Sequence, residues 1–450
     1  MPAPAYSHLI EKVRNHAIAL TGNTADYTAL FEMIGDARFV LIGEATHGTD
    51  EFYDIRAELT KQIIRYHGFA AVAVEADWPD AYRVNRYVRG DPDINNADSA
   101  LGDFARFPTW MWRNEVVVEF AEWLRDYNQK RIPTSKKAGF YGLDLYSLNA
   151  SIRAVIDYLD KVDPPAALRT RHYYGCFDNF YAQNPQDYGY ASTVGLTRSC
   201  ERDVVRQLAV LRQRAFDYLQ QDGQIASDAF FCAEQNAKLV VNAEEYYRSM
   251  FQNRASSWNL RDRHMAETLE SLAAHLSEQR GEPAKIVVWA HNSHVVDARA
   301  TEMGERGELN IGQLMRERHG SDAVLIGFST YDGTVTAASE WDGPAEKKAV
   351  RPALAESYEA LFHDTGLKNF LLILRDNVEM AKHLHLNRLQ RAIGVLYLPR
   401  TELQSHYFYS HLPQQFDAVI HIDRTNALRP LETAGLWHKG EVFETYPAGF

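Results

Sequence analysis

The chain has 450 residues, of which 46% are hydrophobic and 24% are charged, and its formal net charge is −12. This is the composition of a folded globular protein, and the length can hold several average domains or one large unit with an insertion. The acidic charge argues against nucleic-acid and anionic-membrane partners, because both need a basic patch, and no apolar run approaches the roughly 20 residues of a membrane span. We therefore expect a small-molecule partner.

The N-terminal residues 1–8 contain no basic region followed by an apolar core. No secretory signal is expected, and the expected location is the cytoplasm. The three cysteines, Cys176, Cys200 and Cys232, form neither a CxxC pair nor a metal-ligand spacing. We expect them to be free thiols.

The first strong strand signal is the apolar run at residues 38–42, which follows two predicted helices within residues 7–33. The run stops at a Gly-Glu-Ala-Thr-His-Gly loop, residues 43–48. A helix capped by Thr49 is predicted to end near Gly68, and a second buried strand at residues 70–74 ends on Glu75-Ala76-Asp77-Trp78. Strand, helix and strand in this order indicate a βαβ unit.

The next helix begins at Pro79 and carries Arg83. An aromatic segment, residues 107–114, contains Trp110 and precedes a predicted helix at residues 115–129. A third strand, at residues 138–142, ends close to Asp144. From residue 152 to about residue 280 the pattern predicts only helices, at residues 199–221, 227–251 and 259–280.

Strands are expected again at residues 285–290 and 323–328, followed by a hairpin-like turn at residues 331–334. Helices are expected at residues 311–318 and 353–364, and late strands at residues 370–374 and 418–422, whereas the basic stretch at residues 382–391 has no clear pattern. The predicted class is α/β, with a mostly parallel central sheet flanked by helices and a large helical insertion. Residues 1–150 and 283–450 are expected to form the two parts of the core, and residues 151–282 the insertion, as one wall or lid of a cleft.

Ionisable side chains follow four of these apolar runs. The carboxyl ends of parallel strands lie along one edge of a sheet, so we expect the four groups to converge on one crevice. Structural ion pairs could explain any single group. Four in a row favour function, because unpaired buried charge is costly. The groups are Glu44 with His47, Glu75 with Asp77, Asp144, and His291 with His294.

Histidines beside carboxylates are suited to general acid–base chemistry. His47 is the best candidate for a base that takes a proton from water, and Glu44 or Glu75 would orient it. Arg56, on the following helix, could neutralise charge on an acyl oxygen.

His291 or His294 would polarise a carbonyl or protonate a leaving oxygen. No GxSxG motif occurs and the cysteines lie in the helical region, so direct attack by water is favoured over a covalent intermediate.

The same side chains allow a metal-dependent alternative, with Glu44, His47 and His291 as ligands of Zn²⁺ or Mn²⁺. Neither HExxH nor a Cys/His cluster is present, and no phosphate-binding glycine motif follows a strand. We therefore expect neither a metal nor a cofactor.

Several sequence blocks in order resemble the erythromycin esterase family. The resemblance covers residues 37–431. The blocks are IGEATHG at residues 42–48, VEADW at 74–78, RFPTWMW at 106–112, YGLDLYS at 141–147, AHNSH at 290–294 and FDAVIHIDRT at 416–425.

This resemblance implies hydrolysis of the lactone ester of 14-membered macrolides by a non-serine mechanism. It implies that His47 is the general base and Glu44 the essential glutamate, and it matches Arg56, Glu75, His291 and His294 to the remaining positions. Side chains expected to bind the substrate are His294, Trp78, Trp110, Asp144 and Arg83.

A more distant likeness, to haem-binding and metalloprotease relatives with a similar GExxH strand end, keeps two alternatives open. One is a metal-dependent hydrolase of another ester or amide. The other is a non-enzymatic, haem-like ligand-binding protein.

Overall fold

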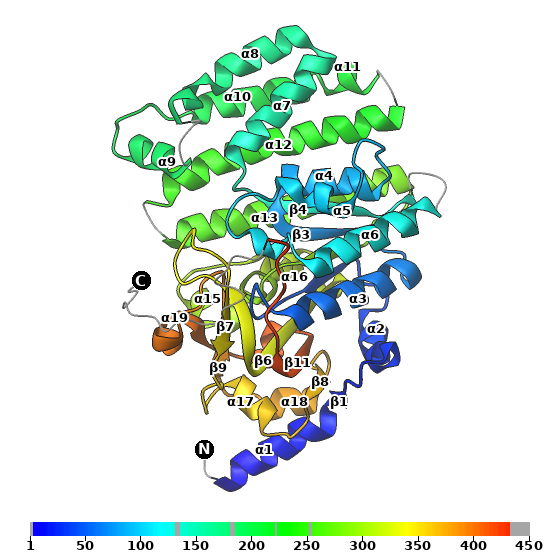
Figure 1. The fold of residues 1–450 in the computed structure, drawn as a ribbon, viewed down its shortest axis with the longest axis vertical. Helices are drawn as coiled ribbons and strands as arrows, with labels where there is room; N and C mark the ends of the chain where they lie inside the picture. Colours follow the sequence, from blue (N-terminus) through cyan, green and yellow to red (C-terminus); the bar gives the residue numbers. More distant parts are fainter. Residues whose placement is uncertain (1–2, 131–135, 181–184, 221–222, 252–253, 433–450) are drawn as a thin grey trace. The chain divides into compact units, whose positions relative to one another are not determined.

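The computed structural model describes residues 3–130, 136–180, 185–220, 223–251 and 254–432 (Figure 1). The chain divides into two compact units. Unit 1 comprises Met1–Val72, Tyr87–Gly139 and Lys285–Phe450, and unit 2 comprises Ala73–Arg86 and Phe140–Ala284.

The sheet of unit 1 is formed by β1 (Ile18–Ala19), β2 (Phe39–Ile42), β5 (Ile286–Trp289), β6 (Ala323–Ala337), β7 (Glu346–Val350), β8 (Asn369–Ile373) and β11 (Ala418–Thr425). Their order is β1-β8-β11-β6-β2-β5, and β7 pairs with β6. The pairs β11–β6, β6–β2 and β2–β5 are parallel, whereas β1, β7 and β8 pair antiparallel. All residues of β2 and β5 are buried. A strand covered on both faces needs apolar side chains at every position, which explains the continuous apolar runs.

Helix α3 (Asp50–Tyr66) follows β2 and buries one face, which includes Phe52, Arg56 and Ile63. Its C-cap residue is His67, and Gly68 follows with φ +74°, as the sequence predicts. The other helices of unit 1 are α1 (Ala3–His16), α2 (Thr28–Ile34), α5 (Ala97–Ala100), α6 (Glu115–Gln129), α14 (Asn292–Val295), α15 (Glu302–Glu305), α16 (Ile311–His319), α17 (Tyr358–His363), α18 (Val378–His383), α19 (Glu402–His406) and α20 (Leu412–Gln415).

Unit 2 contains the carboxyl ends of two neighbouring strands, β3 (Ala71–Asp77) and β4 (Gly139–Asp144). Its helices are α4 (Trp78–Val88), α7 (Leu148–Val162), α8 (Pro164–Tyr174), α9 (Pro185–Thr193), α10 (Glu201–Gln213), α11 (Ala215–Leu219), α12 (Gly223–Ser249) and α13 (Arg254–Arg280). From α7 to α13 the described residues form no strand. The α/β class with a mostly parallel central sheet and a large helical insertion is therefore confirmed. Across the described ranges, no helix combines the length and apolar character that crossing a bilayer requires.

The hairpin turn expected at residues 331–334 was wrong, because β6 continues through these residues to Ala337. Gly333 has φ +136° and faces Thr425 of β11, and a Cβ at this position would lie 2.1 Å from the Thr425 carbonyl oxygen. Glycine is therefore required here for close strand approach rather than for a turn. The β6–β7 connection lies at residues 338–345 instead.

Two other local predictions also needed correction, and a stretch without a clear pattern contains a strand. The helix expected at residues 353–364 begins only at Tyr358, and the helix expected at residues 199–221 is divided at Arg214 into α10 and α11. The basic stretch at residues 382–391 contains β9 (Arg388–Arg391), which pairs with β10 (Tyr407–Ser410). Arg391 is buried and lies 3.1 Å from Glu402, so this strand is stabilised by ion pairs and does not show an apolar pattern.

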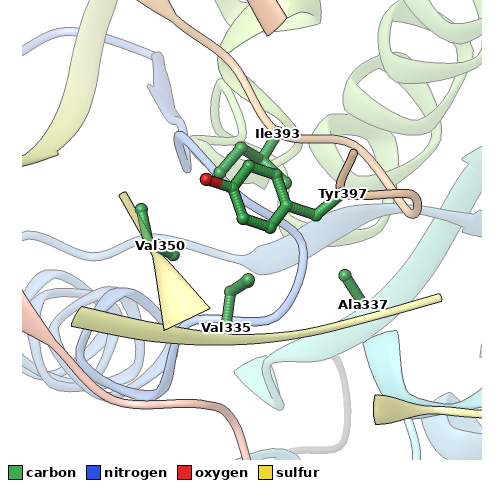
Figure 2. Packing of buried hydrophobic residues seen from close by; sticks show 5 residues of the cluster. All are labelled: Val335, Ala337, Val350, Ile393 and Tyr397. Carbon is green, nitrogen blue, oxygen red and sulfur yellow. The ribbon is translucent and has the colours of Figure 1, made fainter. Parts of the chain in front are cut away.

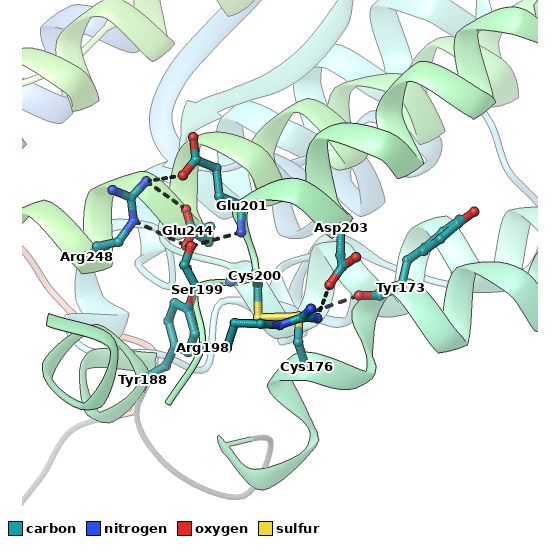
Figure 3. The surroundings of a disulfide bond; sticks show 10 residues. All are labelled: Tyr173, Cys176, Tyr188, Arg198, Ser199, Cys200, Glu201, Asp203, Glu244 and Arg248. Carbon is teal, nitrogen blue, oxygen red and sulfur yellow. Dashed lines mark hydrogen bonds and ion pairs between the residues drawn. A yellow bond between two sulfur atoms is a disulfide. The ribbon is translucent and has the colours of Figure 1, made fainter. Parts of the chain in front are cut away.

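A disulfide joins Cys176 to Cys200 in unit 2, so the prediction of free thiols was wrong for both (Figure 3). Cys232 is a free thiol, and burial raises its pKa to about 12. Beside the disulfide, Tyr188 Oη donates to Glu244 Oε1 at 2.6 Å and accepts from the Cys200 backbone N–H at 2.9 Å. These contacts connect α9, α10 and α12. The spacing of the cysteines could not indicate this pairing, because it depends on the fold that brings Cys176, which follows α8, close to Cys200 at the start of α10.

Candidate functional site

The loop at residues 43–48 follows β2 and begins and ends with a glycine. At both glycines, atoms of other segments lie so close that a side chain would not fit. A Cβ on Gly43 would lie 2.1 Å from Asn292 Oδ1, and one on Gly48 would lie 1.8 Å from the Thr336 carbonyl oxygen. The Gly48 carbonyl accepts from the backbone N–H groups of Thr336, at 2.9 Å, and Leu428, at 2.8 Å. The two glycines thus hold the residues between them in one backbone conformation.

His47 and Glu44 form a buried pair in this loop. His47 Nδ1 lies 2.8 Å from Glu44 Oε1, and the His47 side chain is 9% exposed. A carboxylate can only accept, so this contact assigns the Nδ1 proton to His47 and makes Nε2 the basic nitrogen. Nε2 has no hydrogen-bond partner among the residues that the structure describes.

Arg56 reaches the other oxygen of Glu44 from α3. Its Nη2 lies 2.7 Å from Glu44 Oε2 as a charge pair rather than an aligned hydrogen bond, and Arg56 is fully buried. The guanidinium also lies over the rings of Tyr53, at 4.3 Å, and Trp289, at 5.2 Å. Cation–π contacts favour a cation at this position. Arg56 therefore holds the Glu44 carboxylate through Oε2, the oxygen that does not contact His47.

His291 lies next to His47, with ring centroids 4.6 Å apart. It caps the short helix α14: its Nδ1 accepts from the backbone N–H of Ser293 at 3.2 Å, and Nε2 donates to the Ile393 carbonyl at 3.2 Å. His291 therefore carries its proton on Nε2, the opposite tautomer from His47. His294 is buried on α14, one turn further along the helix.

A compact apolar cluster supports this loop (Figure 2). The backbone N–H of Ile393 donates to the Ala45 carbonyl at 2.8 Å, while its carbonyl accepts from His291. The Ile393 side chain packs with buried residues of β6 and β7 and with Tyr397. The members of the cluster are Val335, Ala337, Val350, Ile393 and Tyr397.

A second acidic cluster lies within unit 2. Arg261 of α13 forms a two-pronged contact with Asp144, with Nε at 3.0 Å from Oδ1 and Nη2 at 2.6 Å from Oδ2. The same Nη2 lies 2.7 Å from Glu75 Oε1, and the guanidinium lies 4.9 Å from the Tyr146 ring centroid. Burial would raise the pKa of Asp144, but the charge and hydrogen bonds of Arg261 outweigh it and hold this pKa below its usual range.

The strand-end groups thus form two clusters, one in each unit. Unit 1 brings together Glu44, His47, Arg56 and His291, and unit 2 brings together Glu75 and Asp144. The convergence of all four groups on one crevice stays a prediction. Arg261 was missed by the sequence analysis, because nothing in the pattern of its helix marks it from the other arginines.

The remaining residues predicted to bind substrate have different surroundings. Trp78 is buried in unit 2, where its ring lies 5.8 Å from Tyr141 and 5.7 Å from Phe231, and Arg83 is half-buried on α4. Trp110 lies in unit 1, is 2% exposed, and packs edge-on against Phe107 at 5.4 Å. Within the described ranges, no group of three or more His, Cys, Asp or Glu side chains is placed to hold a metal ion.

Comparison with known proteins gives a family match. A family model described as erythromycin esterase matches residues 64–425. A Bacillus subtilis (strain 168) protein, YbfO, which is named as a hydrolase, is 23% identical over 438 residues, covering 93% of this chain and 90% of that protein. Erythromycin esterase type II of Escherichia coli is 24% identical over 327 residues, covering 70% of this chain and 74% of that protein.

A solved structure shares the fold. The structure of an erythromycin esterase mutant in its open conformation matches with a TM-score of 0.66 at 18% identity, covering 91% of this chain and 96% of that chain. At this identity the likeness extends to the fold alone.

Proposed function

Because the chain belongs to the erythromycin esterase family, we propose that it is a carboxylic-ester hydrolase that opens the lactone of erythromycin-type macrolides. The observation that carries this proposal is the His47–Glu44 pair, whose 2.8 Å contact leaves Nε2 of the imidazole as a base. The family match favours a hydrolase over the haem-like binding alternative. The cytoplasmic location stays a prediction.

In the proposed reaction, His47 Nε2 removes a proton from a water molecule while the water oxygen attacks the lactone carbonyl carbon. In the tetrahedral intermediate, the bond between the former carbonyl carbon and the ester oxygen of the lactone ring then breaks. The proton on Nε2 passes to the leaving alkoxide oxygen, which becomes a hydroxyl group. The product is the ring-opened hydroxy acid, heavier than the substrate by one water, and no acyl-enzyme forms.

Glu44 acts by accepting the Nδ1 proton and by stabilising the imidazolium that forms during the reaction. Arg56 is fully buried behind Glu44, so we assign it a positioning role in place of contact with an acyl oxygen. Both nitrogens of His291 are bonded to the chain, which supports a positioning role beside His47. Glu75, His294, Trp78, Trp110, Asp144 and Arg83 stay proposed contributors to catalysis or substrate binding.

The test is incubation of the purified protein with erythromycin, followed by mass spectrometry. We expect a product heavier by one water. An unchanged substrate, with an active macrolide esterase as the positive control, would overturn the macrolide assignment. Chelator-treated protein separates the metal-dependent alternative, because full activity of metal-free protein contradicts it.

A further inference from the structure

The β6–β7 hairpin extends past the strand end that precedes His47. Ile42, the last residue of β2, pairs with Ile326, whereas β6 continues to Ala337. The Thr336 backbone N–H donates to the Gly48 carbonyl at 2.9 Å, so the hairpin stands directly beside the candidate catalytic loop. The apolar cluster in Figure 2 includes Val335 and Ala337 of β6 and Val350 of β7, so it packs along the paired part of the hairpin.

The connection at the tip of this hairpin carries an exposed tryptophan. Trp341 is 60% exposed, and its ring centroid lies 5.1 Å from that of Phe107. Phe107 in turn packs against Trp110. We call Phe107, Trp110 and Trp341 the aromatic platform. Trp110 adds a buried indole N–H that has no hydrogen-bond partner in the described parts of the chain.

A second route through the chain leads from the same loop to the aromatic platform. Gly48 accepts from Leu428, and Pro430, two residues later, forms a bridge with Asn114. The Asn114 side-chain amide donates to the carbonyls of Trp110, at 3.0 Å, and Met111, at 3.1 Å. The platform is thus connected to the His47 loop both through the hairpin and through residues 428–430, entirely within unit 1.

The length of the hairpin connection limits the separation between platform and loop. Five residue steps from Thr336 to Trp341 span at most roughly 17 Å. The platform therefore lies close enough to the His47 loop for a macrocycle with attached sugar rings to touch both. Exposed aromatic faces bind ring-shaped ligands through apolar contact, and aromatic side chains commonly line ligand sites.

We propose that the exposed Trp341 of the aromatic platform binds an apolar ring face of the substrate, with Phe107 and the buried Trp110 packed in support, and that this contact favours ring-bearing esters large enough to reach from His47 to Trp341. The proposal rests on the proposed function, because it concerns substrate selection at the same site. Trp341 is not part of the proposed proton transfer. Its removal should weaken binding of the large substrate, because an apolar contact with the ring is lost.

The test is calorimetric titration of erythromycin into His47→Ala protein, which holds the ligand without turning it over. Adding Trp341→Ala should raise the Kd roughly three- to tenfold, the range expected for loss of an aromatic contact. Adding Trp341→Phe, which keeps an aromatic face, should restore most of the affinity. The control is Tyr66→Ala, which removes a 74% exposed aromatic side chain at the end of α3 and should leave the Kd unchanged.

Equal Kd values for the Trp341→Ala and Tyr66→Ala proteins would overturn the platform, as would no binding of erythromycin to any of them. Hydrolysis of erythromycin by the wild type is measured separately. Hydrolysis combined with a Kd that does not depend on Trp341 overturns the platform and leaves the proposed function. Binding that depends on Trp341, without hydrolysis of erythromycin by the wild type, supports the platform and overturns the proposed function.

Discussion

The two acidic clusters share a carboxylate–arginine ion pair, but only the unit 1 cluster contains histidines. In each, a carboxylate at the carboxyl end of a buried strand meets an arginine from a helix: Glu44 with Arg56 in unit 1, and Asp144 with Arg261 in unit 2. In the unit 2 cluster, Arg261 lowers the pKa of Asp144, and the carboxylates raise the pKa of Arg261, so both groups stay charged. The unit 1 cluster includes an imidazole, and its contact with Glu44 leaves a basic nitrogen. A buried acid at a strand end is therefore a poor sign of catalysis unless it orients such a group.

The largest effect that we expect from this comparison is on stability, at Arg261. Arg261→Met leaves Glu75 and Asp144 without their guanidinium, and breaking a buried ion pair costs about 3–5 kcal/mol of the free energy of unfolding. Urea denaturation measures this change. Arg198→Met, which removes a 78% exposed arginine from its pair with Asp203, is the control and should have no measurable effect. Equal results for the two variants would show that the unit 2 cluster is not a stabilising ion network.

The next largest effect is expected on kcat in Glu44→Gln protein, which tests whether Glu44 acts through His47. Glu44→Gln keeps an acceptor for Nδ1 but removes the charge that stabilises an imidazolium, so kcat for erythromycin should fall about 10²-fold. The same variant leaves Arg56 unpaired and should lower the urea midpoint. Glu317→Gln, at a 41% exposed carboxylate of α16, is the matched control. Wild-type kcat in Glu44→Gln protein would contradict the orienting role.

A smaller effect, on the pH dependence of stability, is expected at His264, an imidazole with a polar neighbour at each ring nitrogen. His264 is buried in unit 2 and lies 2.7 Å from Asn242 Nδ2 and 3.5 Å from Thr268 Oγ1. Burial, with a smaller effect of Lys238, lowers its pKa to about 3. The folded state then disfavours the protonated form, so the stabilisation is complete above pH 6.5 and is lost as the pH falls below it.

Between pH 7 and pH 5 the expected loss from His264 is about 2 kcal/mol in the free energy of unfolding. His264→Gln should flatten this part of the stability profile and leave the hydrolysis of erythromycin unchanged. An unaltered pH dependence in the variant would show that His264 is protonated in the folded state at these pH values.

The sequence predicted the parts of the fold that depend on local pattern. The runs that form β2 and β5 are apolar throughout because both faces are covered, and Glu44 and His47 could be identified because they are ionisable residues just after such a run. The turn prediction at Gly333 was wrong, because the sequence does not distinguish a glycine needed for close contact between two strands from one needed for a turn.

Long-range pairings were not accessible in the same way. Arg261 contacts carboxylates that are far from it in sequence, and the disulfide joins residues 24 positions apart in a region of ordinary helical pattern. Nothing in the sequence distinguishes Trp341 from the other aromatic residues. Its exposure and its contact with Phe107 depend on where the β6–β7 hairpin ends.

The most direct test of the central claim is the turnover of erythromycin by His47→Ala protein. If Nε2 of His47 is the base, kcat should fall on the order of 10³-fold while the urea unfolding curve stays that of the wild type. Turnover within tenfold of the wild type, in protein with an unchanged unfolding curve, would contradict the claim that this imidazole carries the reaction.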